Sequence, residues 1–339
     1  MASSASPAPS RKKALLSLLV LAVLTGIIVL VFRENWAEIT AALSRLTLWQ
    51  GLAALAVGLS YPLLEGVACW LIVRSRLPEF SLREGIDGAW MGTFGNVVGL
   101  GAGSVPMQTW YLHRLGLDVG PGVGLMTLQY VFHKTAVLLY ATVLLLVGRP
   151  WLAAHSGGVL KYLPAAYAVV AGVIVGLIAL CVLPVVQRLA RWLLHFLPDT
   201  GRWAQRRENW LEQLDILCTE SRHLLTDKPR CLAILAVHLC KLFLLFCLPW
   251  MGLRFMGLES GLHFGQVQLL AALTLFVSNA LPNVAGMGSV ETAFLLVYGS
   301  FLPDSAAMSL LMFYRLASYY AVFAASAVGF AAAQRRLAR

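Results

Sequence analysis

One stretch of this chain combines a helix breaker, small residues and a carboxylate inside an otherwise apolar region. It spans residues 282–291, which read PNVAGMGSVE, and Arg315 follows inside the last apolar run. A charge at the centre of a bilayer costs roughly 2.5 to 3.5 kcal/mol on insertion scales, so such residues persist mainly when paired or facing a polar cavity. Broken backbone at that depth is tolerated only where it is buried in protein or lines water. The stretch therefore predicts a polar site at membrane depth.

Glu291 and Arg315 are the strongest candidates for that site. Pairing the two side chains would relieve the cost of two intramembrane charges, and a lipid phosphate could compete for the guanidinium fork of the arginine. A purely structural ion pair is the alternative. The two residue types alone do not separate these interpretations.

Small and amide residues surround the same break. Asn279 and Asn283, like Asn96 earlier in the chain, would either hydrogen-bond headgroup oxygens or cap half-helices, and capping is the simpler expectation. Gly286 and Gly288 would let the backbone approach closely. Half-helix N-termini that point inward would add partial positive charge, which suits an anionic headgroup.

A second basic site is predicted earlier in the chain. Lys134 follows His133 within an apolar run, and the ammonium group could meet a phosphate as a point charge. The alternative is that Lys134 is a buried residue paired with Glu65. If transport is coupled to an ion gradient, Glu291 or the Glu65 and His133 set could carry protons. His238 and Lys241 share a helical face at i and i+3, but we expect Lys241 to snorkel toward the membrane surface.

The elements that must position these residues follow from composition. Over 339 residues the chain is 59% hydrophobic and 12% charged, with a mean hydropathy of +0.75, which predicts an all-α polytopic integral membrane protein. The net charge of +10 is attributed to membrane orientation and anionic headgroups, and we expect no nucleic-acid partner. The six cysteines show no metal-ligand spacing and are interpreted as small packing residues.

The basic residues predict the orientation. Of 26 Lys and Arg residues, three lie within apolar segments, five in one set of loops and eighteen in the other. By the positive-inside rule, the rich set faces the cytoplasm. Both termini belong to that set, so we expect a multi-pass protein of a bacterial inner membrane with cytoplasmic N- and C-termini.

Hydropathy predicts about six full spans plus two interrupted segments. The spans lie near 14–32, 48–73, 120–147, 163–186, 231–253 and 305–333. The interrupted segments, 85–112 and 265–301, contain uninterrupted halves of about 16 residues, or roughly 24 Å, which is short of a hydrocarbon core of about 30 Å. We predict that each segment forms a broken, re-entrant helical hairpin. The first span is expected to be a retained helix, since no convincing cleavage site follows it.

The two interrupted segments resemble each other. Asn96 followed by Gly103-Ser104-Val105 parallels Asn279 followed by Gly288-Ser289-Val290. The charge distribution places the first hairpin on the cytoplasmic side and the second on the outer side, which predicts an inverted-topology repeat with a site near the midplane. The alternative is that the small residues only allow close helix packing.

The remaining parts are a tail and a connector. Residues 1–13 are expected to be a disordered cytoplasmic tail, and 14–339 a single transmembrane domain. Within it, 187–230 is predicted to be a basic amphipathic connector on the inner leaflet, because Trp and Leu recur there at roughly helical spacing among arginines. It would either gather anionic lipid or serve as a structural link.

Residues 91–147 and 275–330 resemble the membrane region of lysylphosphatidylglycerol synthases and related stand-alone flippase-like proteins. The family pattern is Pro, two residues, Gly-Gly, one residue, Gly, two residues and Glu, with an aromatic-Arg pair further along. The matching positions here are Pro282, Gly286, Gly288, Glu291, Tyr314 and Arg315, with Ala285 in place of the first glycine. In the first half the chain keeps Asn96 and the turn at 101–103, but Gly99-Leu100 stands where the family has Leu-Pro.

The resemblance implies lipid translocation, or partnership with lipid modification, without aminoacyl transfer. The expected cargo is an anionic phospholipid or a glycolipid, with hopanoid-related lipids included. The alternatives are a non-transporting partner of a lipid-modifying enzyme or glycosyltransferase and, less favoured, an intramembrane lipid transferase. No nucleophile elbow, His-Glu-x-x-His helix or phosphate-binding Gly-rich loop occurs in the sequence, so we expect no enzymatic activity and no cofactor.

Overall fold

A computed structural model describes residues 36–99, 101–155, 163–196, 200–281 and 288–338. Throughout these ranges the regular structure is helical, which confirms the predicted all-α polytopic class. The predicted first span, 14–32, and the tail at 1–13 lie outside the described residues, as do Asn283 and Gly286.

Four long helices form the body of the molecule. In the described ranges, the helical stretches that are long and apolar enough to cross a membrane are α3 (Leu48–Val73), α6 (Val119–Ala154), α10 (Lys228–Phe255) and the continuous stretch Asp304–Leu337. These confirm the predicted spans at 48–73, 120–147, 231–253 and 305–333. The last one consists of α13 (Asp304–Arg315), a π-helical turn (Leu316–Tyr320) and α14 (Ala321–Leu337).

The predicted span at 163–186 is wrong at its C-terminal end. Helix α7 (Leu163–Val182) stops before Leu183, and α8 (Pro184–His195) leaves it at an angle of 101°. Pro184 occupies the first turn of α8, where its missing N–H is tolerated, whereas continuing α7 through it would remove a helix hydrogen bond. Residues 184–186 therefore belong to the amphipathic connector rather than to the span.

Both interrupted segments fold as hairpins of short helices. The first consists of α4 (Leu82–Val98) and α5 (Ser104–Arg114), and the second of α11 (Phe264–Ala280) and α12 (Ser289–Tyr298). The longer arms have 17 residues each, about 26 Å at 1.5 Å per residue, and are too short to cross a core of about 30 Å. The two predicted broken hairpins are thus confirmed.

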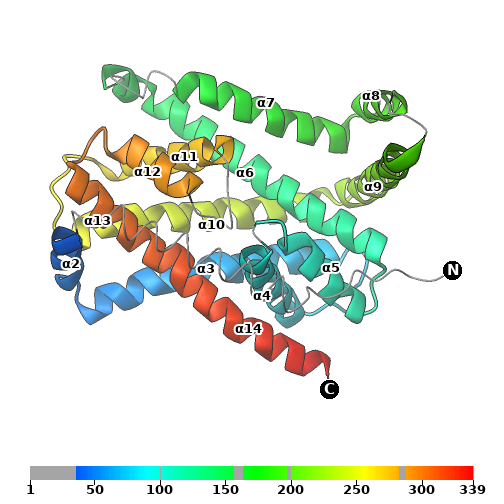
Figure 1. Ribbon diagram of the computed structural model, residues 1–339, viewed down its shortest axis with the longest axis horizontal. Helices are drawn as coiled ribbons and strands as arrows, with labels where there is room; N and C mark the ends of the chain where they lie inside the picture. The colour runs from blue at the N-terminus through cyan, green and yellow to red at the C-terminus, as the bar shows by residue number, and fades with distance from the viewer. Residues whose placement is uncertain (1–35, 100, 156–162, 197–199, 282–287, 339) are drawn as a thin grey trace.

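The hairpins occupy corresponding places in two similar halves. A long helical element precedes each hairpin and another follows it: α3 and α6 for the first, α10 and the continuous stretch Asp304–Leu337 for the second. In Figure 1 the α4–α5 hairpin lies toward the right-hand end of the long helices, and the α11–α12 hairpin lies toward the left-hand end. Opposite ends are what an inverted-topology repeat requires.

The α4–α5 hairpin is closed by direct backbone contact. A Cβ added at Gly103 would lie 1.9 Å from the carbonyl oxygen of Gly95, so only glycine fits at this position. The hairpin is also tied to the C-terminal helix, because Arg336 donates to both carboxylate oxygens of the buried Asp87, with 2.8 Å between Nε and Oδ2. These contacts join the two arms of the hairpin and tie α4 to α14.

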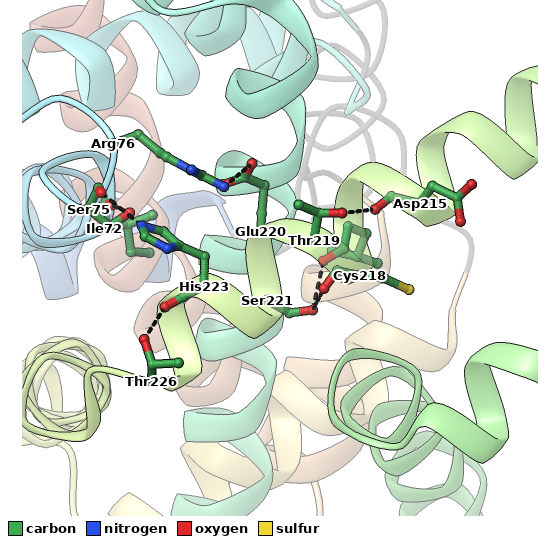
Figure 2. A network of polar contacts seen from close by, with 11 residues as sticks. Ile72, Ser75, Arg76, Asp215, Cys218, Thr219, Glu220, Ser221, His223 and Thr226 are labelled. Atoms are coloured by element: carbon green, nitrogen blue, oxygen red, sulfur yellow. Dashed lines mark hydrogen bonds and ion pairs between the residues drawn. The ribbon is translucent and has the colours of Figure 1, made fainter.

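The predicted connector consists of α8 and α9 (Gly201–Leu225), and α9 is docked on the body of the protein. Figure 2 shows Arg76, just after α3, donating to both oxygens of Glu220 at 2.9 and 3.0 Å. His223 of α9 contacts the carbonyl oxygen of Ser75 at 3.0 Å. Cys218 lies in the same helix, and burial raises the pKa of its thiol, which agrees with a packing role.

A short helix, α2 (Trp36–Ser44), packs against α13 at the opposite end of the long helices.

Candidate functional site

The predicted pair of Glu291 and Arg315 forms in the structure. The Nε atom of Arg315 donates to Oε1 of Glu291 at 2.6 Å, and a terminal guanidinium nitrogen lies 2.5 Å from the same oxygen. Both residues are buried, at 7% and 6% exposure. Two opposite charges are thus brought out of solvent together, as their cost at membrane depth requires.

Local structure at the start of α12 holds the carboxylate in place. Gly288 precedes the helix with φ of +86°, a conformation that L side chains rarely adopt. Its N–H donates to Oε2 of Glu291 at 2.7 Å, as in half of a capping box. A carboxylate in the first helical turn is also stabilised by the helix dipole. Glu291 therefore has structural partners on both oxygens.

Arg315 lies where the last long helix changes its hydrogen-bonding pattern. It ends α13 and is followed directly by the π-helical turn Leu316–Tyr320, and its guanidinium carbon lies 4.5 Å from the centre of the Tyr319 ring. Single π turns inside α-helices are frequent at functional sites. The hydropathy of the sequence carries no signal for this turn, and the cation–π partner Tyr319 was not among the predicted site residues.

Lys134 reaches the second hairpin instead of Glu65. Its Nζ donates to Oδ1 of Asn279 at 2.7 Å, which joins α6 to the C-terminal end of α11. The amide nitrogen of Asn279 donates back to the carbonyl oxygen of Leu275 at 2.8 Å, so the side chain is oriented by its own helix. The expected alternative of a Lys134–Glu65 pair is therefore wrong. Asn279 does not act as an N-cap either, because it stands at the end of α11 rather than at the start of a helix.

Two cations therefore meet the two ends of the break in the second hairpin. Lys134 binds the α11 side through an amide, which neutralises no charge, and Arg315 binds the α12 side through one carboxylate. Asn279 is exposed and Lys134 is half-buried, so this edge of the site is accessible from outside the protein core. The two cationic side chains and one carboxylate leave this break with an excess of positive charge, and both cations are of types that bind phosphate oxygens.

The described residues behind the hairpin leave little free space. A cavity of about 30 Å³ lies between α10, α11, α12 and α13, and its lining includes Ser278 and Tyr314. That volume holds one or two water molecules and is far too small for a lipid headgroup. The described residues therefore leave no room for a headgroup between these four helices.

Glu65 belongs to a separate buried cluster between α3, α6 and α10. Its Oε2 accepts from Lys241, whose side chain is 0% exposed, and its Oε1 accepts from Gln129 at 2.6 Å. The Lys241 ammonium also lies 4.5 Å from the Tyr61 ring centre. The expectation that Lys241 snorkels is therefore wrong, because a buried carboxylate within reach gives the ammonium a better partner than the distant surface. Lys241 and Gln129 were missed as cluster members.

The structure separates the predicted site residues into three places. Glu291, Arg315, Asn279, Gly288 and Lys134 meet at the second hairpin. Glu65 and His133 lie in the buried cluster, where the His133 ring contacts that of His238 with centroids 5.6 Å apart.

Asn96 and Gly103 belong to the first hairpin. The carbonyl oxygen of Asn96 accepts the Gly101 N–H at 2.8 Å in the turn, and Gly103 packs against Gly95. Both residues thus help to form the turn of the first hairpin in the structure.

Taken together, the helices and hairpins define a polytopic helical membrane protein with a cationic site at a broken hairpin. Residues 15–326 match the family described as the lysylphosphatidylglycerol synthase TM region, and the chain belongs to that family. The match covers nearly the whole chain, so the membrane region accounts for most of the sequence. No curated protein matches the chain.

Proposed function

We propose that this protein translocates an anionic phospholipid or glycolipid between the leaflets of a bacterial inner membrane, with its own termini in the cytoplasm. Membership of the lysylphosphatidylglycerol synthase TM family supports a role in lipid handling. The observation that carries the finer proposal is the convergence of Arg315 and Lys134 on the two ends of one broken hairpin, against a single carboxylate. The chain acts as a carrier rather than as an enzyme.

The mechanism uses exchange of ligands at Arg315. We take the structure as the closed state, in which Glu291 occupies the guanidinium and keeps a second partner in the Gly288 N–H. A phosphate that enters the opened site displaces the carboxylate from Arg315 and takes a further contact from Lys134, while the acyl chains stay in hydrocarbon. Return of Glu291 to Arg315 then releases the phosphate. The carboxylate is a built-in competitor, which keeps binding weak enough for release.

The basic end of the molecule supports the proposed orientation. The loop after α3 holds Arg74 and Arg76, the connector holds Arg188, Arg191 and Arg206, and α14 ends in Arg335 and Arg336. Figure 1 places the end of α14 and the α9 connector toward the same side of the molecule. An excess of basic residues on one side is typical of the cytoplasmic face.

Docking of a lipid-modifying enzyme is the competing role, and one observation favours it. Trp203 and Trp210 of α9 are 46% and 45% exposed, which gives the connector an aromatic surface. Tryptophans are enriched both in protein interfaces and at membrane surfaces. Replacing both with Ser, which leaves the Glu220 and His223 contacts of α9 in place, should cost a docking protein its partner and leave a carrier active in purified liposomes.

The direct test is lipid movement in liposomes. Purified protein is reconstituted with fluorescent phosphatidylglycerol or phosphatidylcholine, and the fraction of probe in the outer leaflet is followed by chemical quenching. The wild type should move the anionic probe, and Arg315→Gln should abolish that movement. Arg191→Gln removes an arginine whose ion pair with Asp215 is largely exposed, so it serves as the matched control. Equal rates in all three proteins would overturn the proposal.

A further inference from the structure

The buried cluster between α3, α6 and α10 contains polar atoms without hydrogen-bond partners among the described residues. These atoms are Nδ1 and Nε2 of His238, Nδ1 of His133 and Oε1 of Gln129. His238 is 0% exposed. Leaving a buried donor or acceptor unsatisfied costs about 1–3 kcal/mol each, so such a group calls for an explanation.

The surroundings of His238 are charged on several sides. From α3, Glu65 and Tyr61 belong to the same cluster, and from α6 the His133 ring lies 5.6 Å away between centroids. Lys241 stands one turn further along α10 and pairs with Glu65.

Two further groups lie at the edges of the cluster. Lys134, next to His133, is held by Asn279. Tyr314 of α13 lies near Tyr61.

One carboxylate in this cluster thus has two candidate cationic partners. Glu65 pairs with Lys241 in the structure, and His238 stands one turn before Lys241 on the same helix, with its ring against that of His133. A neutral imidazole has one nitrogen with a free lone pair, and it becomes a donor on both nitrogens when protonated. The protonated ring could therefore replace the ammonium at Glu65.

We propose that His238 is a proton-binding site whose imidazolium competes with Lys241 for Glu65. The proton comes from the aqueous phase and forms an N–H bond at the lone-pair nitrogen of the ring. The imidazolium then donates to the Glu65 carboxylate, and the Lys241 ammonium leaves it. Loss of the same proton to the aqueous phase restores the Glu65–Lys241 bridge. One proton is taken up and one is released in each cycle.

The location of the bridge gives this exchange a mechanical consequence. Glu65 is on α3 and Lys241 is on α10, the long helices that precede the two hairpins, and these helices pack side by side. The bridge therefore joins the two halves, and alternation between them requires it to loosen. For the carrier role, which rests on the function proposed above, proton binding at His238 would couple lipid movement to a pH gradient.

The first experiment measures the proton directly, without any lipid transport. Protein with ¹⁵N-labelled histidine in lipid bilayers is titrated from about pH 8 to about pH 5, the range of histidine titration, and imidazolium signals are followed by solid-state NMR. Lys241→Met removes the competitor, and Lys241→Met with His238→Gln removes the proposed site as well. His195→Gln, at the exposed end of α8, is the control for assignment.

We expect Lys241→Met to gain an imidazolium signal at neutral pH that is lost in the double variant and unchanged by His195→Gln. If Lys241→Met does not fold, the wild type and His238→Gln are compared at the acid end of the titration. The imidazolium signal of His238 should then be present in the wild type and absent from His238→Gln. If no imidazolium signal depends on His238, the proposal is overturned.

The second experiment applies a pH gradient in the liposome assay. Lipid movement in the wild type should depend on the gradient, and His238→Gln should lose that dependence while downhill exchange continues. Unchanged dependence in His238→Gln contradicts the coupling role. If the wild type moves no lipid at all, the carrier function itself is wrong, and the NMR titration still decides whether His238 binds the proton.

Discussion

The two hairpins have the same architecture and different chemistry. In α4–α5 the arms meet glycine to glycine, and the charged residue Asp87 is tied to Arg336 at the end of α14. In α11–α12 the arms end at Asn279 and Glu291, and each of these holds a cation from another helix. The comparison teaches that a shared topology places a break in each half, whereas the described residues on either side of the second break each hold a cationic side chain from another helix.

The largest effect should come from filling the glycine contact of the first hairpin. Gly103→Val would place its Cβ against the Gly95 carbonyl oxygen, and no flexible side chain can move aside. We expect a loss of more than about 4 kcal/mol, or failure to fold. Gly172→Val in α7, where a Cβ would meet nothing within 4 Å, is the control. The measurement is the thermal unfolding temperature of both variants in detergent. Equal unfolding temperatures would contradict the tight glycine contact in the first hairpin.

The second-largest effect is expected at Arg315. Arg315→Ala leaves Glu291 buried without its cation, and breaking a buried pair in this way costs about 3–5 kcal/mol. Adding Glu291→Gln to the same chain should recover most of the unfolding temperature, because no unpaired charge remains. Lipid movement should stay lost in the double variant. If movement returns together with stability, the pair is a structural bridge only.

A smaller effect is expected at the anchor of the first hairpin. Asp87→Asn removes the carboxylate that receives Arg336, and since the guanidinium is 35% exposed, water can replace part of the contact. We expect a loss of about 1–3 kcal/mol in unfolding free energy, with headgroup preference unchanged. A changed headgroup preference in Asp87→Asn would show that the first hairpin also takes part in recognition.

The smallest change in stability should occur at Lys134. Lys134→Met removes one hydrogen bond to an exposed amide, which is worth about 1 kcal/mol. Its effect on lipid binding should be much larger, with a reduced preference for phosphatidylglycerol over phosphatidylcholine. Asn279→Ala, which deletes the amide and keeps the cation, should retain that preference. Equal loss in both variants would argue that the contact matters only for packing.

Much of this architecture could be predicted because membrane-spanning helices need a minimum apolar length. Gly, Asn and Pro residues interrupt the runs near 99–103 and 281–288, and the halves that remain are too short to span, which together with the charge distribution of the loops predicted both hairpins. The Glu291–Arg315 pair was predictable because each charge needs a partner at that depth. The 101° bend at Pro184 was missed because apolar residues continue past it.

The partners of Glu65, Lys134 and Lys241 were not predictable from the sequence. Each of these residues has several opposite charges or amides at a suitable depth, and the choice depends on how each helix is rotated about its axis. That rotation is set by packing across the whole bundle, such as Gly58 of α3, where a Cβ would lie 2.0 Å from the Ala317 carbonyl oxygen. Hydropathy and charge spacing carry no information about it.

The most direct test of the central claim is the identity of the lipid that stays with the purified protein. Native mass spectrometry with lipid analysis would compare the wild type, the neutral pair Glu291→Gln with Arg315→Gln, and the exposed-arginine control Arg191→Gln. The account predicts that the wild type and the control retain one class of anionic lipid and that the neutral pair, although folded, loses it. The same lipids on all three proteins would contradict a headgroup site at the second hairpin.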